Sequence, residues 1–264
     1  MRSSDLLPAL ATTGRLGARE YLVEYPPRIL FGTVAPRALL QVLFLTVLGR
    51  AVGGPDGALA AGIGASAFNV VSATVIKAPD VLINERVQGT LYRLRMTELP
   101  LLTLVAARWL VYAAEGIASA LLAVPLVALL TADPALLTGL PAALPLYALT
   151  TMTTSGFGLA LAVVALGRRA DVFLTNFGSY LLLALSGVLA ALPADGLRAL
   201  AGSVLPLTHG IAALRALHDG AGLTEVLRLA GAEALVGLLW VSAAAVGLRI
   251  QTRRLRRSGN DFLI

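Results

Sequence analysis

The sequence predicts an all-α integral membrane protein with six transmembrane helices, an N-terminal interfacial helix, a short cytoplasmic helix and outer re-entrant or half helices before the last span. Three observations predict this fold. The 264-residue chain is 57% hydrophobic and only 14% charged, whereas soluble domains are about 25% charged. Its apolar residues form runs as long as the roughly 20 helical residues that a bilayer core requires. Its basic residues lie between these runs, so a soluble enzyme and a disordered protein are both excluded.

Six apolar runs give the predicted spans in chain order. They are Val34–Gly49, Ala58–Ile76, Pro100–Leu130, Leu137–Leu166, Val172–Leu192 and Val226–Ile250. Before them, Leu16–Tyr25 mixes charged with apolar residues, which predicts a helix lying in the membrane interface and stopped by Pro26-Pro27. We expect a single transmembrane domain over residues 1–264, in which 1–33 form a cytoplasmic N-terminus, 34–250 the six-span bundle and 251–264 a basic cytoplasmic tail.

The positions of the basic residues predict the orientation of the chain. Most of the 21 Lys and Arg residues fall on the side that also holds both termini. Because the more basic side of a membrane protein faces the cytoplasm, both termini are predicted to be cytoplasmic in a multi-pass protein of the cell membrane. The net charge of +6 is explained in the same way. The cations do not gather on one basic face, so we expect no nucleic-acid partner.

The connections on the opposite side are unequal in length. Gly53–Gly57 and Thr131–Leu136 are predicted to be short turns. The third connection is long and contains two helical segments, Ala194–Val204 and His209–His218, each only about 15 Å in length. Both are too short to cross a bilayer. They are therefore predicted to be re-entrant or surface helices, whose irregular backbone must be shielded by protein.

The connection between the second and third predicted spans, residues 78–100, is the most informative cytoplasmic segment. Asp80 can cap a first helical piece, Gly89 then breaks it, and Thr90 can cap a second piece, Leu91–Glu98. The second piece alternates apolar with basic residues. A short, charged and capped helix on the cytoplasmic face favours a docking element for a soluble partner.

The residue types present restrict the chemistry that the chain can perform. The chain has no cysteine and only two histidines, which excludes disulfide scaffolds, Cys-ligated metals and cysteine nucleophiles. It also has no Gly-rich phosphate loop and no acidic metal-binding cluster. We therefore expect no catalytic, cofactor or metal site on this chain. Energy for uphill transport would have to come from a partner or from an ion gradient.

Three ionisable residues lie inside predicted spans, where an unrelieved charge is costly. Arg108 lies close enough to the start of its span to reach the cytoplasmic interface. Glu115 and Glu233 lie deeper, and each fits either a residue lining a transport pathway or an interhelical hydrogen bond. These three are the candidate pathway or intramembrane polar residues. The hydroxyl run Thr150–Ser155 is typical of helix packing.

Two segments resemble the permease subunits of type-2 ABC (ATP-binding cassette) transporters. The first is Asn84–Leu91, NERVQGTL, which is similar to the Glu…Gly-Thr-Leu segment that these permeases place after their second span. The second comprises Gly187, Leu192-Pro193 and Leu205–Arg215. It is similar to the Leu-Pro pair, the Pro-Leu-Thr-aromatic turn and the Leu-Arg element before the last span of the family. With the six-span layout, the resemblance covers nearly the whole chain.

The resemblance implies a transport subunit that is not itself an enzyme. It implies that Glu85–Thr97 holds the coupling helix, which inserts into a groove on a separate ATPase. The residues implied in this contact are Glu85, Arg86, Gly89, Thr90, Leu91, Arg93 and Leu94. The implied assembly is a homodimer of permeases in membrane lipid with two ATPase subunits, which carry the ATP and Mg while this chain carries no cofactor.

The cargo is open among several classes. The implied cargo is a drug such as an antibiotic, conferring resistance, or a natural product or lipid. A lipid-linked polysaccharide is less favoured, because the chain is only 6% aromatic and glycan exporters tend to have aromatic-lined channels. An ion-coupled secondary transporter, with Glu115 and Glu233 carrying protons, is the main alternative, although no internal repeat supports it. A membrane enzyme or scaffold is a third hypothesis, but no cluster of polar residues at one membrane face supports an enzyme.

Overall fold

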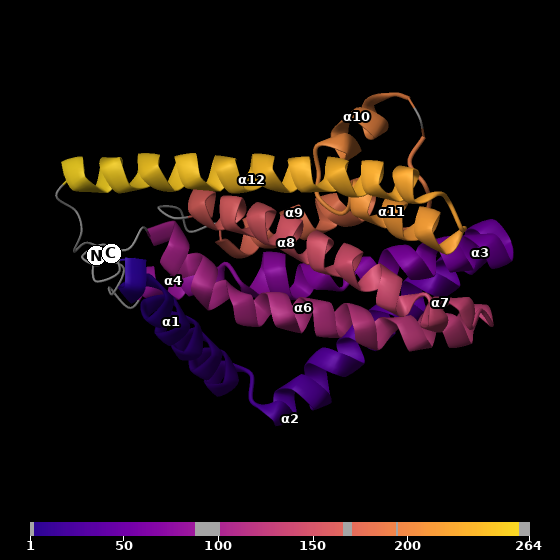
Figure 1. The fold of residues 1–264 in the computed structure, drawn as a ribbon, viewed down its shortest axis with the longest axis horizontal. Coiled ribbons are helices and arrows are strands. Elements are labelled where there is room, and N and C mark those ends of the chain that lie inside the picture. The colour runs from indigo at the N-terminus through magenta and orange to yellow at the C-terminus, as the bar shows by residue number, and fades with distance from the viewer. Residues whose placement is uncertain (1–2, 88–100, 166–170, 194, 259–264) are drawn as a thin grey trace.

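The computed structural model describes residues 3–87, 101–165, 171–193 and 195–258, and every regular element among them is helical (Figure 1). The elements are α1 Ser3–Glu24, α2 Pro27–Ile29, the π-helical turn η1 Leu30–Val34, α3 Ala35–Phe68, the π-helical turn η2 Ser72–Lys77, α4 Asp80–Val87, α6 Leu101–Thr131, α7 Ala135–Thr138, α8 Leu140–Ala165, α9 Asp171–Leu185, α10 Leu197–Ser203, α11 Thr208–His218 and α12 Leu223–Ser258. The all-α prediction is confirmed for the described residues.

Within the described residues, four helical segments are long and apolar enough to cross a membrane, or five when the bent pair α10 and α11 is counted as one span. The four are Pro27–Ile83, Thr103–Thr131, Leu140–Ala165 and Leu223–Gln251. This count differs from the six predicted spans in two places. The first difference lies within α3 and the second at α9.

The first candidate span is interrupted inside α3. Gly53 and Gly54 have non-helical backbone angles, and Gly54 has a φ of +64° that glycine adopts without steric cost. The two arms of α3 pack closely against each other on either side of this break. The contact is so close that a Cβ on Gly49 would overlap Ala61 on the other arm. The first two predicted spans are therefore the two arms of one helical hairpin, with the predicted glycine turn between them.

The fifth predicted span, Val172–Leu192, is shorter in the structure. Its helix α9 ends at Leu185 and has 15 residues, which gives about 22 Å of helix and falls short of a bilayer core. The chain turns at Gly187, whose φ is +72°, a conformation that residues with a side chain rarely adopt. Beyond this turn, α10 and α11 meet at an angle of 94°. That bent pair agrees with the two short helices predicted for the long outer connection.

The helix α1 lies outside the candidate spans and packs against α6. It ends at Glu24, just before the predicted stop at Pro26-Pro27, but it begins at Ser3 rather than at Leu16. Gly17 lets its backbone approach α6 closely, because a Cβ there would lie 2.9 Å from the Cα of Arg108.

The elements gather at two opposite ends of the bundle (Figure 1). The start of α1, the helix α4 and the C-terminal end of α12 lie at one end, which we call the α4 end. The break in α3, the short helix α7 and the helix α11 lie at the opposite end, which we call the α7 end. The helix α6 extends from one end to the other, so it connects them mechanically.

The packing of η2 against α8 gives a direct test of this arrangement. The Thr74 hydroxyl donates a hydrogen bond to the Thr154 hydroxyl oxygen at 3.0 Å, and a Cβ on Gly158 would overlap the backbone carbonyl of Thr74. We expect Gly158→Ala to destabilise the protein by about 1–3 kcal/mol, because a backbone carbonyl cannot move aside easily.

The matched control is Gly231→Ala on α12, where an added Cβ meets no atom within 4 Å. Alanine favours helix there, so its melting temperature should stay constant or rise. Thermal unfolding of the two purified variants in detergent measures both effects. Equal melting temperatures for the two variants would contradict the close packing of η2 on α8.

Candidate functional site

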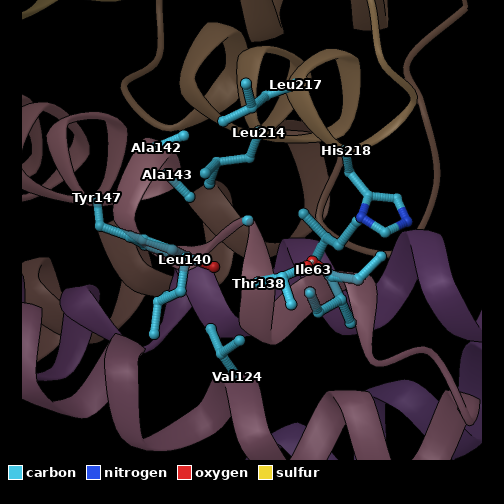
Figure 2. Close-up of a pocket in the computed structure, with 13 residues that line it drawn as sticks. Ile63, Val124, Thr138, Leu140, Ala142, Ala143, Tyr147, Leu214, Leu217 and His218 are labelled. Carbon is cyan, nitrogen blue, oxygen red and sulfur yellow. Dashed lines mark hydrogen bonds between the residues drawn. The ribbon is translucent and has the colours of Figure 1, made fainter.

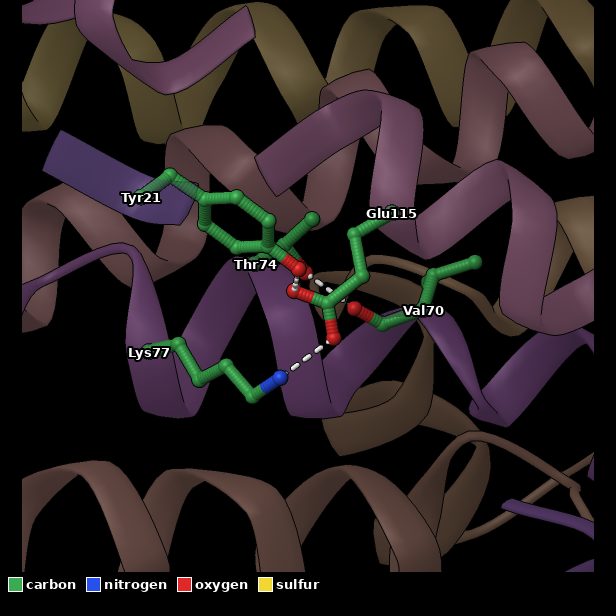
Figure 3. A network of polar contacts seen from close by, with 5 residues as sticks. All are labelled: Tyr21, Val70, Thr74, Lys77 and Glu115. Carbon is green, nitrogen blue, oxygen red and sulfur yellow. Dashed lines mark hydrogen bonds and ion pairs between the residues drawn. The ribbon is translucent and has the colours of Figure 1, made fainter. Parts of the chain in front are cut away.

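Glu115 of α6 is the centre of a polar network that joins three elements (Figure 3). Its carboxylate accepts a hydrogen bond from the Tyr21 hydroxyl of α1 at 2.7 Å and forms an ion pair with Lys77 at the end of η2. The two partners approach different oxygens of the carboxylate. The Lys77 and Glu115 side chains are only 9% and 8% exposed. We call Tyr21, Lys77 and Glu115 the Glu115 clamp.

Two tyrosine side chains, Tyr21 and Tyr25, contact the buried ion pair of the clamp. A buried ion pair is favourable only when its remaining hydrogen-bonding capacity is met. Tyr21 meets part of it for the carboxylate, and burial together with Glu115 raises the pKa of the Tyr21 phenol above its usual 10. Tyr21 therefore stays protonated and remains a donor. On the other side, the Lys77 ammonium lies 4.3 Å from the centre of the Tyr25 ring, a cation–π contact.

Arg108 lies seven residues before Glu115 on α6, and helical geometry therefore places it on nearly the same face. Its guanidinium forms an ion pair with Glu20 of α1. Glu20 is 58% exposed, so this pair lies nearer the surface than the Glu115 clamp. The two intramembrane charges of α6 thus pair with partners on other elements rather than with each other, and α1 is attached to α6 at both.

The segment that leads from η2 into α4 is attached to α6 at two consecutive residues. Lys77 pairs with Glu115, and the indole Nε1 of Trp109 donates a hydrogen bond to the carbonyl of Ala78. The helix α4 then begins at Asp80, which agrees with the first of the two predicted helical pieces. The segment is therefore bonded to α6 on both sides of the peptide bond that joins Lys77 to Ala78.

The predicted ATPase-contact residues lie in and after α4. Glu85 and Arg86 belong to the C-terminal part of α4. The remaining members of that set lie outside the described residues, namely Gly89, Thr90, Leu91, Arg93 and Leu94. The structure thus places the start of the predicted coupling segment at the α4 end of the bundle, immediately beyond the Glu115 clamp.

Glu233 of α12 has a separate set of partners. The side chain is fully buried and accepts hydrogen bonds from the Thr153 hydroxyl at 2.5 Å and from the backbone N–H groups of Leu207 at 2.8 Å and Gly210 at 2.9 Å. The two N–H groups lie at the start of α11, where a helix has donors without partners of its own. A carboxylate is also favoured there by the helix dipole. Glu233 therefore caps α11 and ties it to α8, which is the geometry of an interhelical bond.

Arg215 attaches α11 to other parts of the bundle, a role that sequence analysis missed. Its guanidinium donates to the carbonyls of Ala60 at 2.8 Å, Gly187 at 2.8 Å and Val188 at 3.0 Å. These carbonyls belong to α3 and to the irregular segment after α9. A signal was present in the sequence, because an arginine within a short apolar helix needs acceptors nearby. Lys77 gives a similar signal, because it directly follows the predicted span Ala58–Ile76, where a cation needs a partner.

These contacts suit mechanical attachment better than chemical catalysis. Among the described residues, no three His, Asp or Glu side chains lie close enough together to hold a metal ion. The carboxylates of Glu115 and Glu233 each have donors from two or more other elements. The candidate site is therefore the Glu115 clamp together with the adjoining segment that leads into α4.

The cap on α11 can be tested by a conservative substitution. In Glu233→Gln, the amide nitrogen cannot accept a hydrogen bond, so a buried N–H of Leu207 or Gly210 loses its acceptor. An unsatisfied buried donor costs about 1–3 kcal/mol, and we expect a lower melting temperature in detergent. The matched control is Glu225→Gln on the same helix, which removes an exposed ion pair with Arg228 and should change the melting temperature little. Equal melting temperatures would contradict the cap.

Comparison with known proteins identifies the family. The family model described as ABC-2 type transporter matches residues 25–218, a region that runs from the end of α1 to the end of α11. It includes Lys77, Glu115, α4 and the bent helix pair. No curated protein and no solved structure matches the chain. Members of this family typically pair with ATPase subunits and typically lack cofactors on the membrane subunit. Because the match covers most of its length, the chain belongs to the ABC-2 type transporters, as a multi-pass membrane permease domain that carries out transport without a catalytic ATPase of its own.

Proposed function

We propose that this chain is the permease subunit of an ABC exporter that moves a drug, natural product or lipid-like substrate. Two copies would form the translocation pathway, and two separate ATPase subunits would bind and hydrolyse ATP with Mg. The observation that carries the proposal is the double attachment of the segment before α4 to α6, through Lys77–Glu115 and Trp109–Ala78. A force on the predicted coupling segment would reach α6 through these bonds.

The topology that we propose has six membrane crossings and cytoplasmic termini. The two arms of α3 would count as separate crossings, and α9 would be a short fifth crossing followed by the bent pair. The start of α1 and the end of α12 lie at the same end of the bundle (Figure 1), which supports an even number of crossings. The α4 end would then face the cytoplasm, where the more basic loops belong.

The surroundings of Glu115 and Glu233 support ATP-driven over ion-driven transport. A proton-carrying carboxylate must exchange its proton with water during each cycle. Glu115 is held by a lysine and a tyrosine, and Glu233 by one hydroxyl and two backbone N–H groups. Both carboxylates thus serve to join helices in this conformation. The low aromatic content of 6% favours an apolar cargo over a polysaccharide.

The docking of the coupling segment can be tested by reversing charges. We expect the double variant Glu85→Arg/Arg93→Glu to abolish ATP-dependent transport in proteoliposomes that also contain the partner ATPase, because the reversed charges no longer match the ATPase groove. The amount of protein in the membrane should be unchanged. The ratio of transport to ATP hydrolysis is the measurement. Unchanged transport in this variant, or accumulation driven by the permease alone in an ion gradient, would overturn the proposal.

The Glu115 clamp gives a second test that separates stability from coupling. Removing one partner of a buried ion pair costs about 3–5 kcal/mol, whereas replacing both with apolar residues is often neutral. We therefore expect Lys77→Met and Glu115→Leu each to lower the melting temperature, and the double variant to restore it.

Transport per ATP hydrolysed should stay low in that double variant, because the bond that attaches the segment before α4 to α6 is missing. Restoration of both properties in the double variant would show that the clamp has only a structural role.

A further inference from the structure

A cavity of about 240 Å³ lies at the α7 end of the bundle, between α7, the start of α8 and α11 (Figure 2). Buried side chains form its inner wall, among them Val124, Tyr147 and Leu214. Thr138 and Ala142, at the junction of α7 and α8, are exposed and line it as well. The cavity is thus a pocket with an apolar interior and an opening beside α7.

The polar side chains of the pocket wall have partners inside the protein. The Ser66 hydroxyl donates its proton to the carbonyl of Ile63 at 2.8 Å, so the Tyr147 hydroxyl is the donor in its 2.7 Å contact with Ser66. The Thr138 hydroxyl donates to a backbone carbonyl of α7 at 3.1 Å. The hydroxyl protons that line the pocket are therefore already used, and an apolar ligand displaces none of these bonds.

The histidine of the pocket wall is also paired. His218, at the end of α11, places its Nε2 3.0 Å from a carboxylate oxygen of Asp133, in the turn between α6 and α7. The pair connects α11 to that turn at the edge of the pocket. Most of the remaining lining side chains are aliphatic or aromatic, and the polar ones already have partners, so a charged ligand would lose its hydration without gaining a partner.

We propose that this pocket binds an uncharged apolar group with about the size of a substituted benzene ring. An apolar cavity of about 150 Å³ is large enough for benzene, and 240 Å³ leaves room for a substituent. Such a group comes either from a free small molecule or from the end of a lipid acyl chain. The site lies at the opposite end of the bundle from the Glu115 clamp and does not depend on an ATPase partner.

A ligand in the pocket would contact helices from two parts of the bundle at once. Leu214 and Leu217 come from α11, and Leu136 and Leu140 come from α7 and α8. A ligand between them fills a space that no side chain occupies, and it therefore joins α11 to the α7 end by dispersion contacts. Apart from the His218–Asp133 pair, α11 is held by Glu233 and Arg215 on its other sides.

Photolabelling of the intact protein in lipid nanodiscs tests the proposal. The probe is 3-trifluoromethyl-3-phenyldiazirine, an uncharged substituted benzene whose carbene inserts into nearby side chains. We expect saturable labelling of the peptides that contain Leu136–Leu140 and Leu214–Leu217, and competition by excess trifluoromethylbenzene. In a parallel arm, a phosphatidylcholine with a diazirine at its acyl end labels the same peptides when the pocket accepts lipid chains. Labelling by the first probe alone assigns the pocket to free small molecules.

Two variants and a matched control make the result decisive. Ala143→Phe fills the pocket and should abolish the saturable labelling, whereas Leu144→Phe, at the neighbouring exposed position outside the pocket wall, should preserve it. Leu217→Ala enlarges the pocket and should retain labelling, and an unchanged melting temperature of Ala143→Phe in detergent shows that the filled variant is folded. Non-saturable labelling that is equal at the exposed Leu129 and Leu235, and that is unaffected by Ala143→Phe, would overturn the proposal.

Discussion

The buried ion pair between Lys77 and Glu115 is the interaction on which the α4 end of the molecule depends. Either charge alone would be costly in a low-dielectric interior, so each side chain fixes the position of the other. Because Lys77 ends η2 and Glu115 belongs to α6, the pair determines where the chain leaves the bundle to form α4. Tyr21 adds α1 to the same carboxylate. One carboxylate therefore positions three elements that are far apart in the sequence.

A related constraint governs the long connection between α9 and α12. Irregular backbone at membrane depth must find hydrogen-bond partners within the protein. Glu233 supplies acceptors for the free N–H groups at the start of α11, and Arg215 supplies donors for carbonyls near Gly187. The carboxylate thus accepts from backbone N–H groups, and the guanidinium donates to backbone carbonyls. This division explains how a bent helix pair can follow a helix that stops at Leu185.

Much of the fold could be predicted from local sequence. Apolar run length locates α6, α8 and α12 to within a few residues for most helix ends, and Gly53-Gly54 marks the break in α3 because glycine permits its backbone angles. Helix length at α9 could not be predicted, since hydropathy continues past Leu185 while the backbone turns at Gly187. The partners of Glu115 and Glu233 were also beyond sequence reasoning. They come from residues 94 and 80 positions away, and only packing brings them together.

The helix α6 contributes residues to both the Glu115 clamp and the pocket. Glu115 lies in the clamp and Val124 in the pocket wall, about 14 Å apart along the same helix. Both residues belong to the continuous helix α6, so a displacement imposed on Glu115 would be passed along its backbone toward Val124. The pocket wall opposite Val124 is contributed by α11, which Glu233 and Arg215 hold to α8, α12 and α3. The pocket thus lies between a helix that is attached to the Glu115 clamp and a helix that is attached to other elements, so any movement of α6 relative to α11 would change the width of the pocket.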